Sequence, residues 1–291
     1  MKKFFLVACA AVVASVFLTG FVENKAKYMA IDLSSGEVSY IDVEPSGGWS
    51  DYYKTSKLVL RRIEAGTFVM GSPTNELGRF DNENSHEVTI DRPFYIGVFE
   101  ITQKQYQIIA GRDLSEFVGD TLPVQNVSFL DIRGREKGAA WPANDDVDDY
   151  SFLGKLRTKL KMNFDLPTEE QWEYACRAGT VTALNNGTNL ASIDTDSNLD
   201  ILGLYAGNGG LDLWKSKGPT AVGSYRPNSW GLYDMHGNVW EWCLAGNTGI
   251  RVFRGGCWRS RAGNCRSARR DGNCSGNASA LYGFRVVLEE Q

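Results

Sequence analysis

The feature that most constrains this chain is an aromatic stretch at residues 228–243, in which glycines space the large rings. Three tryptophans and one tyrosine fall within residues 230–242, and each large ring buries about 150–250 Å². So dense a cluster is expected under the core. Residues alternate beyond Gly237 as in an extended chain, so Trp240 and Trp242 share one face. The residues expected to be structural here are Gly237, Asn238, Trp240 and Trp242.

Glu241 lies between these two tryptophans on the opposite face, where a carboxylate needs a partner. Two interpretations are open. Protein donors, such as a backbone amide or an arginine, can satisfy Glu241 and make it a buried structural residue. Alternatively, Glu241 and Val239 contribute to a structural calcium site, because carboxylate and carbonyl oxygens suit Ca²⁺. The sequence requires no cofactor, and this calcium is its one candidate metal.

The chain begins with two lysines and an apolar run at residues 4–18, which is the pattern of a secretory signal peptide. The run is shorter than the ~20 residues that a membrane-spanning helix needs. We assign residues 1–22 to a signal peptide and expect an exported protein at the cell surface or outer membrane. Cys9 comes too early for a lipoprotein signal, and Phe21 stands where its cysteine should be. Attachment to the membrane by a lipid anchor therefore stays open.

Cysteine, histidine and charge content exclude several classes of function. One of the six cysteines lies in the signal segment, and the remaining odd number leaves at least one thiol unpaired. The chain has only two histidines, His86 and His236, so a multi-histidine metal site is excluded. The net charge of −4 and the pI near 5.4 give no basic footprint for nucleic acid. We expect no nucleic-acid partner.

Strand patterns predict an N-terminal hairpin, a linker and one larger domain. Residues 28–33 and 38–43 flank a Ser-Ser-Gly turn and predict the hairpin, and residues 45–48 predict the linker. We assign residues 23–50 to the hairpin and linker and residues 51–291 to a single domain. The further strand pairs predicted in that domain are 58–63 with 67–72 and 86–90 with 94–99.

Helix starts are marked by capping residues. A threonine three residues before a glutamine, the spacing of a capping box, occurs at Thr102 and Thr168. Gly111 and Gly179 are expected to end these two helices. The helical segments predicted from such signals begin at Thr102, Ser128 and Thr168, with one more across residues 152–160.

A series of short motifs runs through the chain from about residue 58 to residue 288. The motifs are Met70-Gly71-Ser72, Glu100-Ile101-Thr102, Pro123-Val124, the helix at 166–179, the stretch at 231–242, Arg254-Gly255-Gly256 and Gly283-Phe284-Arg285. In this order they resemble the formylglycine-generating-enzyme (sulfatase-modifying factor) domain family. The resemblance implies an α+β fold of the C-type-lectin-like kind, with two helices around a small antiparallel sheet and abundant irregular loops.

The same resemblance implies where catalytic cysteines would stand. Active family members resemble one another in a redox cysteine pair that follows the Gly-Gly turn and is separated by four residues. Here Ser260 occupies the first of those places, and Cys257 and Cys265 are eight positions apart. We therefore expect a non-catalytic member and not an enzyme. The alternative is an exported oxidase of the formylglycine-generating type, which would act on a cysteine of a protein substrate through Cys257 and Cys265.

The C-terminal segment, about residues 251–288, alternates fixed-looking motifs at residues 254–256, 265–268 and 283–285 with inserts that have no helix or strand period. This alternation resembles the variable region of proteins diversified by a diversity-generating retroelement. It implies a surface-displayed receptor or adhesin that binds a protein or other macromolecule on a host or neighbouring cell. Aromatic and arginine anchors with small neighbours suit such a surface. The candidate ligand-binding residues are Phe253, Cys257, Trp258, Arg259, Ser260, Arg261, Arg269, Asp271, Gly272, Asn273, Ser279, Ala280, Leu281 and Tyr282.

We expect these candidate residues to form one contiguous exposed patch, although they come from separate inserts at residues 257–261, 269–273 and 279–282. Exposed substitutions usually change stability by less than about 0.5 kcal/mol. The sequence therefore predicts that the inserts tolerate replacement without unfolding. The combination expected to be tolerated is Trp258, Arg259, Arg261, Asp271 and Asn273.

Overall fold

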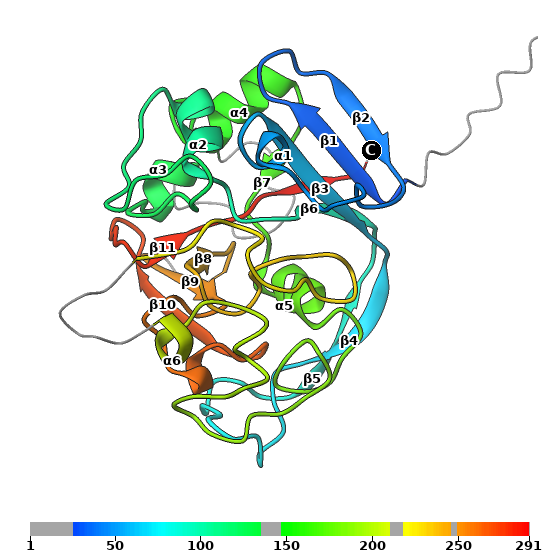
Figure 1. The fold of residues 1–291 in the computed structure, drawn as a ribbon, viewed down its shortest axis with the longest axis vertical. Coiled ribbons are helices and arrows are strands. Elements are labelled where there is room, and N and C mark those ends of the chain that lie inside the picture. Colours follow the sequence, from blue (N-terminus) through cyan, green and yellow to red (C-terminus); the bar gives the residue numbers. More distant parts are fainter. Residues whose placement is uncertain (1–25, 135–146, 210–217, 246–248, 291) are drawn as a thin grey trace, which may run out of the picture.

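The computed structural model describes residues 26–134, 147–209, 218–245 and 249–290. The predicted signal peptide at residues 1–22 lies outside them. Two sheets, a two-stranded ribbon and short helices are joined by long irregular loops (Figure 1). The described part of the chain has no helix long and apolar enough to cross a membrane. The α+β fold class and the abundance of loops agree with the prediction.

The larger sheet has six strands, and every pairing within it is antiparallel. In spatial order the strands are β2 (Val38–Ile41), β1 (Tyr28–Asp32), β3 (Lys57–Ile63), β6 (Phe94–Gly97), β12 (Val287–Glu289) and β7 (Phe164–Asp165). The predicted N-terminal hairpin is present as β1 and β2, and it is the edge of this sheet. The C-terminal strand β12 lies inside the sheet, so both ends of the described chain are tied into one layer.

The other predicted strands exist, but their pairing differs from the prediction. β3 pairs with β1 and β6, whereas β4 (Gly66–Met70) pairs with β5 (His86–Ile90) as a separate ribbon. All four residues of β6 are buried, as are Leu58, Val59 and Leu60 of β3. β4 and β5 carry mostly exposed or half-buried residues. β3 and β6, which both carry runs of buried residues, therefore pair inside the larger sheet although they are not neighbours in the sequence.

The helices begin where the sequence predicts. Thr102, Ser128 and Thr168 each form a complete capping box, with side chain and backbone satisfied reciprocally. The helix that begins after Thr102 ends at Gly111 in the left-handed conformation. The helix that begins after Thr168 ends at Ala178, one residue before Gly179. The helices are α1 (Asp51–Thr55), α2 (Gln103–Ala110), α3 (Phe129–Arg133), α4 (Phe152–Leu160), α5 (Glu169–Arg177), α6 (Ala206–Gly209) and a 3-10 turn (Ala262–Asn264).

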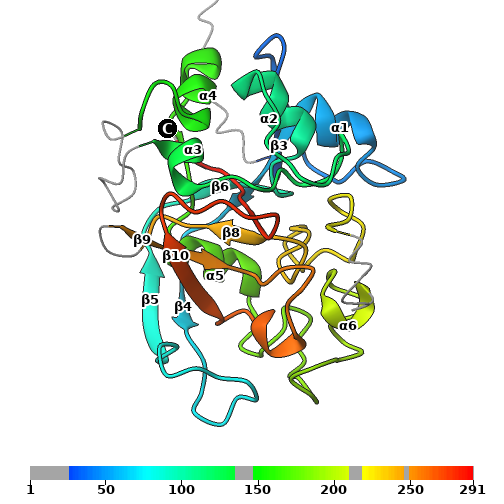
Figure 2. The same cartoon turned by 90° about the vertical axis from the view of Figure 1, so that its left-hand side faces the viewer.

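The smaller sheet is built from the aromatic stretch and the C-terminal segment. Its strands, in spatial order, are β10 (Arg270–Cys274), β9 (Ile250–Arg254), β8 (Trp240–Trp242) and β11 (Tyr282–Gly283). β8 pairs parallel with β11 and antiparallel with β9. Trp240 and Trp242 are both buried in the main core, as predicted, and both rings pack against Phe253. Helix α5 lies between this sheet and the β4–β5 ribbon (Figure 2).

Candidate ligand-binding surface

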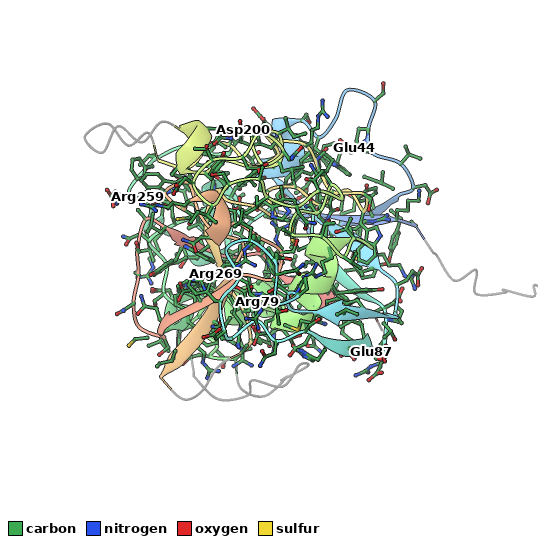
Figure 3. The ribbon with its side chains drawn as sticks, turned by 90° about the horizontal axis from the view of Figure 1, so that it is seen from below. Glu44, Arg79, Glu87, Asp200, Arg259 and Arg269 are labelled. Carbon is green, nitrogen blue, oxygen red and sulfur yellow. The ribbon has the colours of Figure 1, made fainter. Side chains whose placement is uncertain are left out.

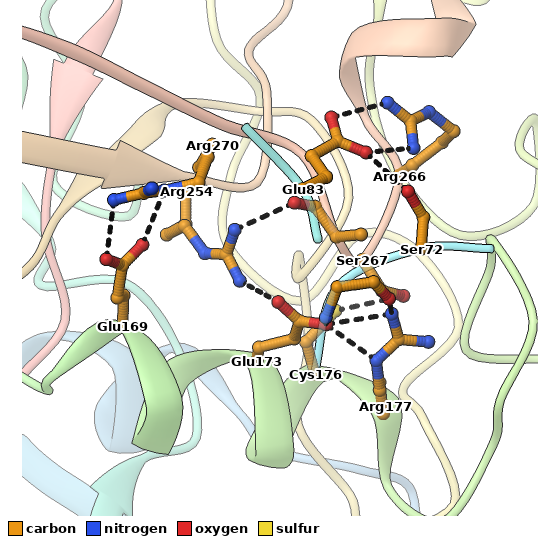
Figure 4. Close-up of polar contacts among 12 residues, drawn as sticks. Ser72, Glu83, Glu169, Glu173, Cys176, Arg177, Arg254, Arg266, Ser267 and Arg270 are labelled. Atoms are coloured by element: carbon orange, nitrogen blue, oxygen red, sulfur yellow. Dashed lines mark hydrogen bonds and ion pairs between the residues drawn. The ribbon is translucent and has the colours of Figure 1, made fainter. Parts of the chain in front are cut away.

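Each fixed motif of the C-terminal segment carries an arginine that is completely buried and paired with a buried glutamate. Arg266 donates to both oxygens of Glu83 over 2.7 and 2.8 Å. Removing one partner of such a pair strands the other charge and costs about 3–5 kcal/mol. The fixed motifs therefore anchor the segment from beneath. The three pairs are Arg254 with Glu173 and Arg266 with Glu83, both drawn in Figure 4, and Arg285 with Glu241.

Glu173 on α5 joins several parts of the chain. Its carboxylate accepts from Arg254 of β9, from the Nε of Arg177 at 2.8 Å, and from the backbone N–H of Gly71 at 2.9 Å. Gly71 has a φ of 87°, and a Cβ there would lie 2.4 Å from a backbone oxygen, so only glycine fits. One buried carboxylate thus fixes the end of β4, helix α5 and strand β9 relative to one another.

Glu241 is satisfied by protein donors, as the first of the two interpretations requires. Arg285 donates to its two oxygens over 2.6 and 2.7 Å, and Trp172 Nε1 donates to Oε2 over 2.8 Å. The N–H of Val239 donates to Glu100 at 3.2 Å, and the Val239 side chain is buried. A calcium ion at Glu241 would have to share these occupied oxygens with a guanidinium group. Glu241 is therefore a poor calcium ligand in this arrangement.

Two further carboxylates, Glu100 and Asp234, are buried close to Glu241. Burial, together with repulsion from Asp234 and Glu241, raises the pKa of Glu100 well above its usual range, and burial raises that of Asp234 to about 6. Asp234 Oδ2 accepts from Gly223 at 2.6 Å, but its Oδ1 is buried without a partner. Arg285 and Lys54 offset part of the charge of these three carboxylates, and the raised pKa values mean that Glu100 and Asp234 take up protons more readily than free carboxyls do. The described residues contain no cluster of three or more carboxylates, histidines or cysteines placed to hold a metal ion.

Five candidate ligand-binding residues are buried, which corrects the expectation of one exposed patch. Phe253 and Trp258 belong to the main core, where Trp258 packs edge-on against Phe117 at 5.5 Å. A combined replacement that includes Trp258 is therefore not neutral for folding. The five buried residues are Phe253, Cys257, Trp258, Ser260 and Arg269. The exposed or half-buried ones are Arg259, Arg261, Asp271, Gly272, Asn273, Ser279, Ala280, Leu281 and Tyr282.

The three inserts nevertheless meet in space. Trp258 Nε1 donates to the carbonyl of Ala280 at 3.2 Å, which joins the first insert to the third. Asn273 Nδ2 donates to the hydroxyl of Tyr282 at 2.9 Å, which joins the second to the third. These contacts join the three inserts to one another. The fixed motifs with the buried arginines flank these inserts in the sequence.

Two exposed apolar residues that the sequence analysis missed lie beside the inserts. Phe80 and Ile193 are 44% and 42% exposed, and both line a groove of about 270 Å³ together with Arg261 and Asn264. The Arg269 guanidinium lies 3.8 Å from the centre of the Phe80 ring. Figure 3 labels Arg79 and Arg269 in the view from below. No sequence period marks Phe80 or Ile193, because both lie in irregular loops.

The cysteines near the Gly-Gly turn are buried and free of disulfides. Burial raises the pKa of both Cys257 and Cys265, which disfavours the reactive thiolate. Ser260, at the place of the first catalytic cysteine, accepts from the N–H of Cys257 at 3.0 Å. A Cβ on Gly256 would come within 2.6 Å of the Cys265 sulfur, so this thiol lies directly beneath the turn. These thiols have the features of core residues.

His236 is buried, and both of its ring nitrogens contact backbone groups of described residues. Its Nδ1 lies 2.6 Å from the carbonyl of Cys265, and its Nε2 accepts from the N–H of Asn185 at 3.1 Å. Burial lowers the pKa of His236 to about 4, so the ring is neutral at pH 7. A neutral imidazole here bridges three segments of the chain.

Comparison with known proteins identifies relatives of several kinds. Relatives include a serine/threonine-protein kinase of Chlamydia pneumoniae, 28% identical over 77% of this chain but only 37% of the kinase. The inactive C-alpha-formylglycine-generating enzyme 2 of Mus musculus is 34% identical over 77% of this chain and 84% of that protein. The solved structure of Treponema denticola variable protein 1 superposes with a TM-score of 0.64 at 23% identity, covering 80% of this chain and 96% of that one.

The family model named sulfatase-modifying factor enzyme 1-like domain matches residues 54–290, which is most of the chain. The relatives with the larger coverage and the fold of the variable protein agree with this match. The sequence motifs from Met70 to Arg285 lie within the matched range. The chain therefore belongs to the sulfatase-modifying factor enzyme 1-like domain family.

Proposed function

We propose that this protein is a non-catalytic, surface-displayed receptor or adhesin that binds a macromolecular ligand through the exposed residues of its C-terminal segment. The observation that carries the proposal is the division of this segment into buried, ion-paired motifs and inserts that meet in space and carry its exposed residues. Such a division lets the exposed side chains change while the base stays fixed. Likeness to an inactive relative and to a variable protein supports the same direction.

The signal pattern at residues 1–22 supports export to the cell surface. The proposal does not require a lipid anchor and is compatible with one. The ligand is a protein or other macromolecule on a host or neighbouring cell. Diversification of the inserts by a retroelement is part of this proposal, and it rests on the resemblance of the C-terminal segment to retroelement-diversified variable regions.

A displayed library tests the proposal. Arg259, Arg261, Asp271 and Asn273 are randomised together and selected against a fixed panel of unrelated purified proteins. We expect most members to fold and several to bind panel proteins with micromolar affinity or better. A matched library at exposed positions elsewhere, Val43, Val118, Tyr150 and Val181, is expected to yield none. Folded members without binders, or equal yields from both libraries, would refute the proposal.

The alternative function, an oxidase that uses Cys257 and Cys265, makes a different prediction. Such a pair should form a reversible disulfide and consume oxygen in the presence of a cysteine-containing peptide. Burial and the raised pKa of both thiols argue against this chemistry. We expect no oxygen uptake above that of a Cys257→Ala variant. Uptake by the parent protein that this variant lacks would establish the enzyme.

A further inference from the structure

The groove beside the inserts is formed by three segments that lie far apart in the sequence. Gly78, Arg79 and Phe80 come from the loop after β4, Ile193 from a central loop, and Arg261, Gly263 and Asn264 from the C-terminal segment. Phe80 and Ile193 expose apolar surface into solvent, together with the neighbouring Leu77 at 44% exposure. Exposed apolar side chains gathered in one concavity are a mark of an interaction site.

The walls of this groove are fixed before any ligand arrives. Buried Arg266 donates from Nη2 to the carbonyl of Gly78 at 2.6 Å and from Nε to the carbonyl of Gly263 at 2.9 Å, which ties two walls together. The N–H of Gly263 donates to the carbonyl of Ile193 at 2.9 Å, which ties on the third. A rigid groove binds without the cost of ordering loops.

The lining has a definite charge. Among the described residues, two arginines line the groove, Arg79 and Arg261, and no carboxylate does. Both arginines already have partners outside the groove: Arg261 pairs with Asp194 at 3.1 Å, with side chains 70% and 61% exposed, and Arg79 pairs with the fully exposed Asp81 at 3.6 Å and donates to Asn84 Oδ1 at 3.2 Å. Exposed pairs of this kind contribute only about 0.2–1 kcal/mol. An anionic group that enters the groove can therefore replace Asp194 as the ion-pair partner of Arg261.

The groove has a volume of about 270 Å³, at the lower edge of the ~300–1,000 Å³ typical of pockets that enclose whole small molecules. One large side chain from a bigger partner fits such a volume, as the central anchors of protein interfaces do.

We propose that this groove is the anchor site of the receptor, which accepts one aromatic side chain flanked by a carboxylate from a protein partner. The inference rests on the proposed function and deepens it by naming the partner's chemistry. The ring packs against Phe80 and Ile193, and the carboxylate pairs with Arg261 and Arg79. Recognition then combines the inserts with two loops outside the C-terminal segment.

The probe is N-acetyl-L-tryptophan, which carries an aromatic ring and a carboxylate, compared with N-acetyl-L-tryptophanamide, which has the ring without the charge. Binding to the ¹⁵N-labelled full-length protein is followed by amide chemical shifts. We expect shifts centred on residues 78–80, 193–194 and 261–264, with a dissociation constant of about 1 mM for the acid and weaker binding of the amide.

Variants assign the contacts. Phe80→Ala is expected to weaken binding of the acid by about fivefold, as loss of an interface anchor does. Ile193→Asp, which puts a negative charge into the groove, should weaken it further. Arg261→Ala should remove the preference for the acid over the amide, whereas the matched control Arg112→Ala leaves both unchanged, because Arg112 is an exposed arginine outside the groove and outside the inserts. Unchanged melting temperatures show that each variant is folded.

Shifts that map to another face, no shifts up to about 20 times the expected dissociation constant, or Phe80→Ala and Ile193→Asp binding like the parent would each overturn the anchor site. Failure of the proposed function looks different, since the randomised library then yields no binders at all. If the library yields binders whose affinity does not change with Phe80→Ala, the proposed receptor function is kept and the proposed anchor site is refuted.

Discussion

Replacing Arg266 with Met tests whether the fixed motifs are the structural base of the C-terminal segment. The change keeps a long side chain and removes the guanidinium group. Arg266 contacts Glu76 at 2.6 Å and Glu83 at 2.7 and 2.8 Å, and it also donates to two backbone carbonyls. All three side chains are nearly or completely buried. The variant therefore leaves two buried carboxylates without their cation.

The expected loss is about 3–5 kcal/mol of unfolding free energy, the usual result of stranding a buried charge. For a domain of this size, 1 kcal/mol shifts the melting temperature by about 2–4 °C, so the melting temperature should fall by roughly 6–20 °C. Urea unfolding at pH 7.5 and pH 5 adds a second signature. The loss should shrink at the lower pH, because a stranded carboxylate that takes up a proton no longer carries the buried charge.

Arg261→Met is the matched control, because it removes an arginine from the same segment at a position whose side chain is 70% exposed. We expect a change within about 0.5 kcal/mol. Equal destabilisation by the two variants would refute the division into a buried base and exposed inserts. So would a stable Arg266→Met variant, since the buried pair would then contribute nothing that a methionine cannot replace.

Three further predictions concern the core and its charges. Trp242→Ala should lose about 3–5 kcal/mol, whereas Tyr150→Ala, at 89% exposure, should melt within a degree or two of the parent; equal melting points would contradict the organising role of the aromatic stretch. The depressed pKa of His236, about 4 against 6.5 when unfolded, means that its contribution to stability falls as the pH drops below 6.5. Between pH 7.5 and pH 5 the parent should lose about 2 kcal/mol more than a His236→Gln variant, and equal changes in the two proteins would disprove this. The raised pKa of Asp234, about 6, acts in the opposite sense, so that stability is lost as the pH rises from about 4 through 6, and Asp234→Asn should be more stable than the parent at pH 7.5 in EDTA but not at pH 4. If millimolar calcium raises the melting temperature of the parent and not of this variant, a cation binds at Asp234. If calcium has no effect on either protein, protonation alone offsets the buried charge of Asp234.

Local signals predicted much of the fold. The capping boxes at Thr102 and Thr168 fix helix starts because both partners lie within four residues of each other. The buried tryptophans of β8 were predictable because aromatic area and alternation can be read locally. Strand pairing was not, because β3 pairs with β6 across the intervening ribbon.

The candidate site was predicted only in outline. Trp258 and Arg269 lie in segments without a period, and such segments do not distinguish a buried anchor from an exposed one. The arginine partners were also hidden, since Glu83 precedes Arg266 by 183 positions. Phe80 and Ile193 become neighbours of the inserts only through the tertiary fold.

Sequencing the C-terminal segment in many sibling genes or clonal isolates of the source organism tests whether exposed residues vary over a constant buried base. Substitutions should concentrate at exposed insert positions such as Arg259, Arg261, Asp271 and Asn273. Arg254, Arg266 and Arg285 should stay constant, because each neutralises a buried glutamate. Substitutions spread evenly along residues 251–288, or found at the buried arginines, would contradict this expectation.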